Sequence, residues 1–146
     1  MKVFFDTSAL VTAVVDQLPN HATALACYTR FAQPRRGGVK AVCSTHALAE
    51  CYATLTALPL ARRIQPAEAA RLIEENFFVH LDAVPLSAAD YKAGLGRIAS
   101  LGLRSGAIYD ALHVRCAERS GCDRIITYNT ADFERLAPPG IEIATP

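Results

Sequence analysis

The sequence lacks the features that would place the chain in a membrane or on a secretory route. None of its apolar runs reaches the roughly 18 uncharged residues of a membrane-spanning helix, so we expect no membrane span. Its first residues show no succession of basic, apolar and small side chains, which is the pattern of a secretory signal. These absences predict a cytoplasmic protein.

Cysteine pairs with the spacing of metal ligands are also missing. The five cysteines form no Cys-x-x-Cys pair, and the four histidines show no zinc-ligand spacing with them. Most of the cysteines lie in apolar runs, where cysteine behaves as a small buried hydrophobe. We therefore expect reduced thiols, as in a cytosolic protein, and no structural zinc site.

A strong excess of charge of either sign is absent as well. Fifteen basic and fourteen acidic side chains give a net charge of +1, which neither requires nor excludes a nucleic-acid partner. Twelve of the basic residues are arginine, which suits bidentate contacts with phosphate. The densest pairs, Arg35-Arg36 and Arg62-Arg63, fit ordinary solvated surface equally well.

What the sequence does contain is an alternation of short β-rich runs and longer helical patterns. Its 146 residues, 51% apolar, fit one domain with a single core over 1–146, and no linker or repeat divides them. Strands are expected at 3–5, 39–43, 78–81, 124–127 and 141–143, and helices at 9–15, 21–31, 45–57, after Pro66, and at 88–101, 107–119 and 132–136. A turn cluster is expected at 33–38, a cap for the third helix at Ser44 or Thr45, and another cap at Ser87. The alternation predicts an α/β protein with a mainly parallel sheet between helices.

Acidic side chains fall at positions where such a fold gathers ligands, which is at the carboxyl ends of its strands. Asp6 directly follows the first strand, and Asn129 and Asp132 follow the fourth. Glu50 lies close to the apolar face of its helix, and Asp110 lies on a stripe of small residues suited to packing on the sheet. A packed acid is costly unless it is hydrogen-bonded, paired or bound to a metal.

Convergence of these acids at one edge of the sheet predicts a site for a hard divalent cation. Carboxylates gathered without a cation repel one another, and Mg²⁺ or Mn²⁺ would relieve the repulsion and activate a water for attack on a phosphodiester. Each acid also has a simpler explanation. Asp6 fits a helix cap, Glu50 a helix surface, and Asp110 a satisfied buried acid.

Four segments together resemble the PIN-domain family, in particular the VapC-type toxins of toxin–antitoxin pairs. They are Phe4–Leu10, Leu48–Tyr52, Ile108–Ala117 and Ile125–Phe133, and their order and spacing span nearly the whole chain. The resemblance implies a three-layer α/β/α fold around a mainly parallel sheet of about five strands. It also implies a metal-dependent endoribonuclease that leaves 5′-phosphate and 3′-hydroxyl ends.

Carried over by position, the resemblance implies that Asp6, Glu50 and Asp110 are the catalytic acids that bind Mg²⁺ or Mn²⁺. The family usually has an acid where Asn129 stands, so the fourth position is open. Either Asn129, through its amide oxygen, or Asp132 contributes to the site, or Asp132 only caps the turn at Phe133 and the site works with three acids.

Two hydroxyl residues match the family as well. Ser8 and Thr127 resemble hydroxyls that accompany the metal site, although both fit helix or turn caps equally well.

The resemblance further implies an RNA substrate, a cognate antitoxin that covers the cleft, and a homodimer. The region from His21 to Ile73 mixes apolar side chains with arginines and could bury a partner, although core packing explains much of it.

Other functions stay open at this point. Phosphoryl transfer through Asp6 is one, but Ser8 stands where a second acid is common in such proteins, and no Gly-rich loop supports a nucleotide-binding fold. A catalytically weakened PIN-like module that binds RNA or protein is the non-enzymatic alternative, with Asn129 as its trace.

Overall fold

The protein is built around one sheet of five parallel strands, as seen in a computed structural model that describes residues 1–32 and 40–146. The strands are β1 (Lys2–Phe5), β2 (Lys40–Ser44), β3 (Asp82–Val84), β4 (Arg124–Ile126) and β5 (Glu142–Ala144). Their order across the sheet is β3-β2-β1-β4-β5. The expected turn cluster at 33–38, including Arg35 and Arg36, lies outside the described residues.

The helices follow the strands in the alternation that the sequence predicts. They are α1 (Thr7–Val14), α2 (His21–Ala32), α3 (Thr45–Ala57), α4 (Pro66–Ile73), α5 (Ala88–Ser100), α6 (Ala107–Arg119) and α7 (Thr130–Leu136), with a π-helical turn η1 (Glu74–Phe78) after α4. Ser44 caps α3, because its hydroxyl accepts the Ala47 N–H at 3.0 Å, and Ser87 caps α5 together with Asp90. Within the described residues, no helix has the length and apolar character needed to cross a membrane.

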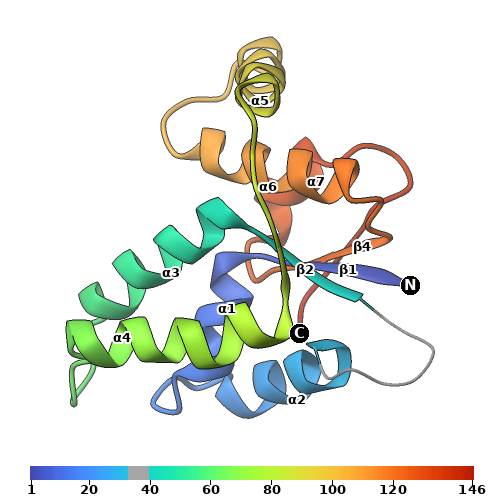
Figure 1. The fold of residues 1–146 in the computed structure, drawn as a ribbon. Helices are drawn as coiled ribbons and strands as arrows, with labels where there is room; N and C mark the ends of the chain where they lie inside the picture. Colours follow the sequence, from blue (N-terminus) through green and yellow to red (C-terminus); the bar gives the residue numbers. More distant parts are fainter. Residues whose placement is uncertain (33–39) are drawn as a thin grey trace.

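Alternation along β1 divides the core into two layers. Val3 and Phe5 point into a cluster with residues of α1, α2 and α3, whereas Phe4 points into a second cluster with residues of α6 and α7. Figure 1 shows the corresponding arrangement, with α1, α2 and α4 on one side of the sheet and α5, α6 and α7 on the other. The predicted three-layer α/β/α fold is therefore confirmed.

One predicted strand is wrong. The segment 78–81 is not extended, because η1 carries the chain helically past Ile73 and β3 begins only at Asp82. The π turn keeps Phe77 fully buried, with its ring 6.1 Å from that of Tyr28, while Phe78 is 60% exposed. A short apolar run fits a helix end as well as a strand, and here the packing of Phe77 against Tyr28 decides between them.

The strand order creates a switch point beside β1. The chain runs from β1 outward to β2 and β3, then returns to the other side of β1 for β4 and β5. Asp6, Ser44 and Thr127 stand at the carboxyl ends of β1, β2 and β4, which are adjacent in the sheet. Ligands in open parallel sheets bind at this kind of position.

Candidate active site

Asp6 is held rigidly at the end of β1. The residue is 2% exposed, and its Oδ2 accepts hydrogen bonds from the Ser8 hydroxyl at 2.7 Å, the Thr127 hydroxyl at 2.8 Å and the Ser8 N–H at 3.3 Å. The last of these bonds makes Asp6 the N-cap of α1. All three bonds use Oδ2, so the carboxylate is fixed through one oxygen.

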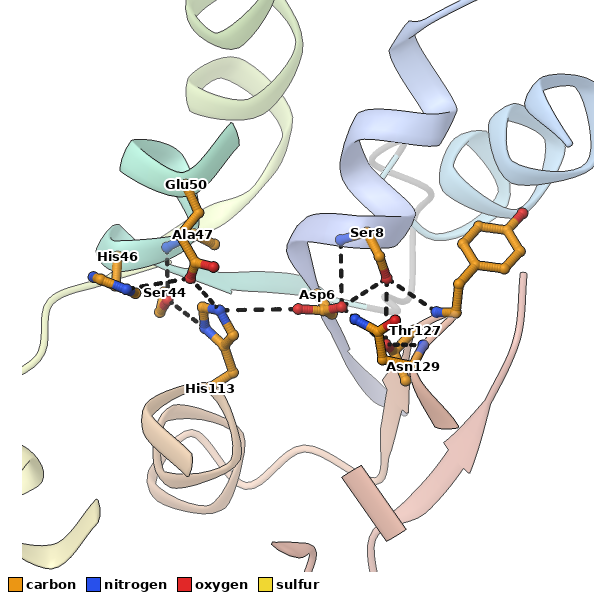
Figure 2. Close-up of polar contacts among 10 residues, drawn as sticks. Asp6, Ser8, Ser44, His46, Ala47, Glu50, His113, Thr127 and Asn129 are labelled. Atoms are coloured by element: carbon orange, nitrogen blue, oxygen red, sulfur yellow. Dashed lines mark hydrogen bonds and ion pairs between the residues drawn. The ribbon is translucent and has the colours of Figure 1, made fainter. Parts of the chain in front are cut away.

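The hydroxyls of Ser8 and Thr127 connect α1 to the loop after β4. Their oxygens lie 3.3 Å apart, and each also accepts a backbone N–H from that loop, Ser8 from Tyr128 at 3.0 Å and Thr127 from Asn129 at 2.9 Å. Figure 2 shows this network on one side of Asp6. Both hydroxyls therefore position the Asp6 carboxylate and the segment that carries Asn129.

Glu50 reaches the same region from α3. Its Oε1 lies 2.7 Å from Nε2 of His113 and 3.2 Å from Nε2 of His46, one turn earlier on the same helix. The His46 ring stacks on Tyr109, with centroids 5.1 Å apart. Burial lowers the pKa of His46. A neutral imidazole at this position does not offset the negative charge of the neighbouring carboxylates.

Asp110 approaches from α6 and is half-buried. Burial raises the pKa of its carboxyl from 3.8 to about 6, and the negative charge of Asp6 adds to the shift. The charges of Asp132 and Glu50 act in the same direction, and that of His113 opposes them. This carboxylate therefore lies in the field of the other acids, as expected for carboxylates that share a cation.

A cleft of about 530 Å³ contains the residues predicted from the sequence. Its lining includes Asp6, Ser8, Glu50, Asp110 and Asn129, from α1, α3, α6 and the loop before α7. The structure thus brings together the three core acids, one hydroxyl and the amide of the proposed fourth position.

Asp132 lies outside that cleft. It lines a neighbouring cavity of about 480 Å³, which also contains Asp110, Arg104 and Arg135. Its carboxylate is half-exposed and pairs with Arg135 one turn later on α7. Asn129 is exposed at the start of α7, and its side chain does not cap the helix. Asp110 is the residue that the two cavities share.

The donor set matches a hard cation, but the acids are not gathered around one point. Across residues 1–32 and 40–146, no three His, Cys, Asp or Glu side chains are close enough together to hold a metal ion. The oxygens that line the cleft are nevertheless those that Mg²⁺ and Mn²⁺ prefer, and the pKa of Asp110, raised first by burial and then by the charge of Asp6, reflects a cost of ionisation that a cation would offset. The metal site therefore fits the residues present and stays a prediction.

His113 is the residue of this site that the sequence analysis missed. It lies one turn after Asp110 on α6, is fully buried, and bonds Ser44 through Nδ1 and Glu50 through Nε2. Burial lowers the pKa of its imidazole, but the hydrogen bond to Glu50 and the surrounding carboxylates outweigh burial, so the pKa is raised. Its i+3 spacing from Asp110, on the same helix face, is a signal that could have identified it.

All five cysteines are free thiols, and four of them are buried, as expected from their apolar surroundings. Burial raises the pKa of the Cys43 thiol to about 12, which makes it a poor nucleophile.

Comparison with known proteins identifies the family to which the chain belongs. The family model of the PIN domain matches residues 3–138. Ribonuclease VapC27 of Mycobacterium tuberculosis is 35% identical over 108 residues, which cover 73% of this chain and 70% of the relative.

Solved structures agree on the fold. VapC20 of Mycobacterium tuberculosis, a sarcin-ricin loop cleaving toxin, has a TM-score of 0.71 at 15% identity, covering 89% of this chain and 92% of its own. VapBC2 of Rickettsia felis, bound to a DNA fragment from its promoter, has a TM-score of 0.66 at 16% identity, covering 98% and 97%. With the matched family model and the acids in one cleft at the carboxyl edge of the sheet, these likenesses lead to one conclusion: the chain belongs to the PIN-domain family.

Proposed function

We propose that this protein is a metal-dependent endoribonuclease and the toxin of a toxin–antitoxin pair. The observation that carries the proposal is the meeting of Asp6, Glu50 and Asp110 in one cleft of a PIN-domain chain. The curated relative VapC27 is a ribonuclease, and several solved relatives are toxin–antitoxin complexes, which supports both parts of the proposal.

Asp6, Glu50 and Asp110 are the residues that would hold Mg²⁺ or Mn²⁺. When bound, such a cation supplies Lewis-acid catalysis for the attack of water on a phosphodiester. The protein's own part is positioning. Ser8 and Thr127 fix one oxygen of Asp6, so the carboxylate does not reorient as substrate arrives.

The neighbouring cavity offers a route for the RNA backbone beside the acids. Arg104 and Arg135 line it, and it adjoins the cleft at Asp110. Arginine side chains at such a position would bind phosphates and offset the repulsion between RNA and the carboxylates. Arg135 also pairs with Asp132, and the guanidinium of Arg62, elsewhere on the chain, pairs with Glu68.

The test of this proposal is cleavage of a panel of structured RNAs by the purified protein. We expect cleavage with Mg²⁺ or Mn²⁺, none after EDTA, and recovery when the cation is added back, because the acids alone supply no Lewis acid. Product ends should be 5′-phosphate and 3′-hydroxyl. Failure to cut any RNA of the panel, together with failure to bind Mn²⁺, would favour the alternative of a binding module without catalysis.

The fourth ligand position is a separate prediction. Asn129 is neutral, so Asn129→Asp should lower the Mg²⁺ concentration needed for half-maximal cleavage by adding a charge to the cleft. We also expect a contribution from Asp132 through its field on Asp110, so Asp132→Asn should raise that concentration.

The measurement is cleavage rate against Mg²⁺ concentration for both variants and for Asp16→Asn, an exposed acid that does not line the cleft and serves as control. If Asp132→Asn cuts normally at low Mg²⁺, its ion pair with Arg135 is its whole role, and the three acids act without it.

Partners and location complete the proposal. An antitoxin is expected from the toxin–antitoxin complexes among the structural neighbours. We propose a homodimer in the cytoplasm. Light scattering that gives a monomer at high protein concentration would remove the dimer.

A further inference from the structure

His113 is a buried polar side chain whose two ring nitrogens are both engaged. Its side chain is 1% exposed, and its ring lies 5.8 Å from the ring of Phe4 in the core beneath the cleft. Nδ1 lies 3.0 Å from the Ser44 hydroxyl, and Nε2 lies 2.7 Å from Oε1 of Glu50. A buried imidazole needs hydrogen-bond partners for both nitrogens. Here both partners belong to α3: Ser44 is its N-cap, and Glu50 is one of its acids.

The direction of these hydrogen bonds follows from the chemistry of the partners. An ionised carboxylate only accepts, so Nε2 carries the hydrogen that is donated to Glu50. The Ser44 oxygen already accepts the Ala47 N–H, and its own hydrogen is free to be donated to Nδ1. If Nδ1 is protonated as well, Ser44 accepts from it instead. The bond from Nε2 to Glu50 is the same in either state.

One imidazole thus links the elements that carry the three acids. His113 belongs to α6, which also carries Asp110, and it holds Glu50 of α3. Its Nε2 lies 3.9 Å from Oδ1 of Asp6, the oxygen not used by the Ser8 and Thr127 hydroxyls. Figure 2 shows the His113 ring between Glu50 and Asp6.

We propose that His113 is a positioning residue that fixes Glu50 for metal binding through its Nε2–H. The inference rests on the proposed function, because it assumes that Glu50 holds the cation. Glu50 lies on the cleft wall, where an unanchored glutamate would sample many rotamers. A hydrogen bond at Oε1 fixes the carboxylate and leaves Oε2 free for the cleft, since no hydrogen bond of the described residues uses Oε2. Partners that orient metal ligands in this way contribute roughly 10- to 100-fold in metal affinity or activity.

Two substitutions separate positioning from core packing. His113→Gln places an amide N–H near the position of Nε2 and so keeps a donor for Glu50, but it loses the contact with Ser44. His113→Asn places its amide near Nδ1, so it keeps the Ser44 contact and falls short of Glu50. Each variant loses the ring and one hydrogen bond, so both should lower the melting temperature.

The experiment measures Mn²⁺ binding by electron paramagnetic resonance without RNA, and then kcat and KM for RNA cleavage. We expect His113→Asn to bind Mn²⁺ about 10- to 100-fold more weakly and to lower kcat without raising KM, whereas His113→Gln stays within about fivefold of the unaltered protein. The control is His80→Gln, the same change at an exposed histidine outside the cleft.

Equal losses in the Gln and Asn variants would overturn the inference and leave the proposed function standing. An unaltered protein that neither binds Mn²⁺ nor cuts RNA would overturn the proposed function and this inference with it. If His113→Asn does not fold, Ser44→Ala provides the second comparison. It removes the partner of Nδ1 and the cap of α3 but keeps the Nε2 donor for Glu50, so a Mn²⁺ affinity per folded molecule close to that of the unaltered protein supports positioning through Nε2, and a large loss overturns it.

Discussion

Asp6→Asn is expected to slow RNA cleavage strongly while leaving the fold in place. Asparagine is as good an N-cap as aspartate, and its amide oxygen can still accept from the hydroxyls of Ser8 and Thr127. The negative charge that would hold the cation is lost. We expect the rate to fall by on the order of 100- to 1000-fold, as when one group that stabilises transition-state charge is removed.

The measurement pairs cleavage rates at saturating Mg²⁺ with thermal unfolding followed by circular dichroism. Asp16→Asn serves as the matched control, because it removes the same charge from an exposed position outside the cleft. If Asp6→Asn cuts RNA like the unaltered protein, Asp6 is only the cap of α1. Cleavage that also survives Asp6→Ala would indicate a contaminating nuclease.

Asp110→Asn is expected to be more stable than the unaltered protein without a cation and to gain less stability than the unaltered protein when a cation is added. The pKa of Asp110 is raised to about 6 in the folded state, so folding is penalised when the carboxyl is ionised. The penalty is absent below about pH 4, grows as the pH rises through 6, and is complete at pH 7.5. A neutral amide has no such penalty. In EDTA at pH 7.5 we expect the variant to be the more stable by about 1 kcal/mol, a value reduced because the carboxyl is half-exposed.

Cation binding should stabilise the unaltered protein more than the Asp110→Asn variant. A ligand that binds only the native state stabilises it by about 2.7 kcal/mol at one hundred times its dissociation constant. The unaltered protein should therefore gain melting temperature with Mg²⁺ or Mn²⁺, and Asp110→Asn should lose much of that gain. Thermal unfolding between pH 4 and 8, with EDTA and with Mn²⁺, measures both effects. A variant that is unfolded in EDTA would make Asp110 a structural acid and contradict its place in the metal site.

Much of the site could be predicted from the sequence because its signals are local. Asp6 directly follows a short apolar run, and a side chain at that place in a parallel sheet lies at the ligand-binding edge whatever the rest of the fold. The positions of Glu50 and Asp110 follow from helical periodicity, which fixes the face of a residue from its neighbours three and four positions away. The caps at Ser44 and Ser87 depend on side-chain chemistry at a helix start.

Features that depend on contacts distant in sequence were decided only by the tertiary structure. His113 bonds Ser44 and Glu50, which precede it by 69 and 63 residues, and periodicity within one helix carries no information about such pairs. Asp132 follows the same strand as Asn129 yet faces the neighbouring cavity, because the start of α7 rotates it toward Arg135.

The strand predicted at 78–81 was wrong because this segment, too, is decided by a contact between residues distant in sequence. Its apolar run suits a strand or a helix end, and only the packing of Phe77 on Tyr28 selects the helix.

The sequence by itself determined the alternation of elements and the acids at the strand ends, because both follow from local pattern. The tertiary structure decided which acids share a cleft and which imidazole bonds Glu50, because those outcomes depend on how α3 and α6 pack across the edge of the sheet.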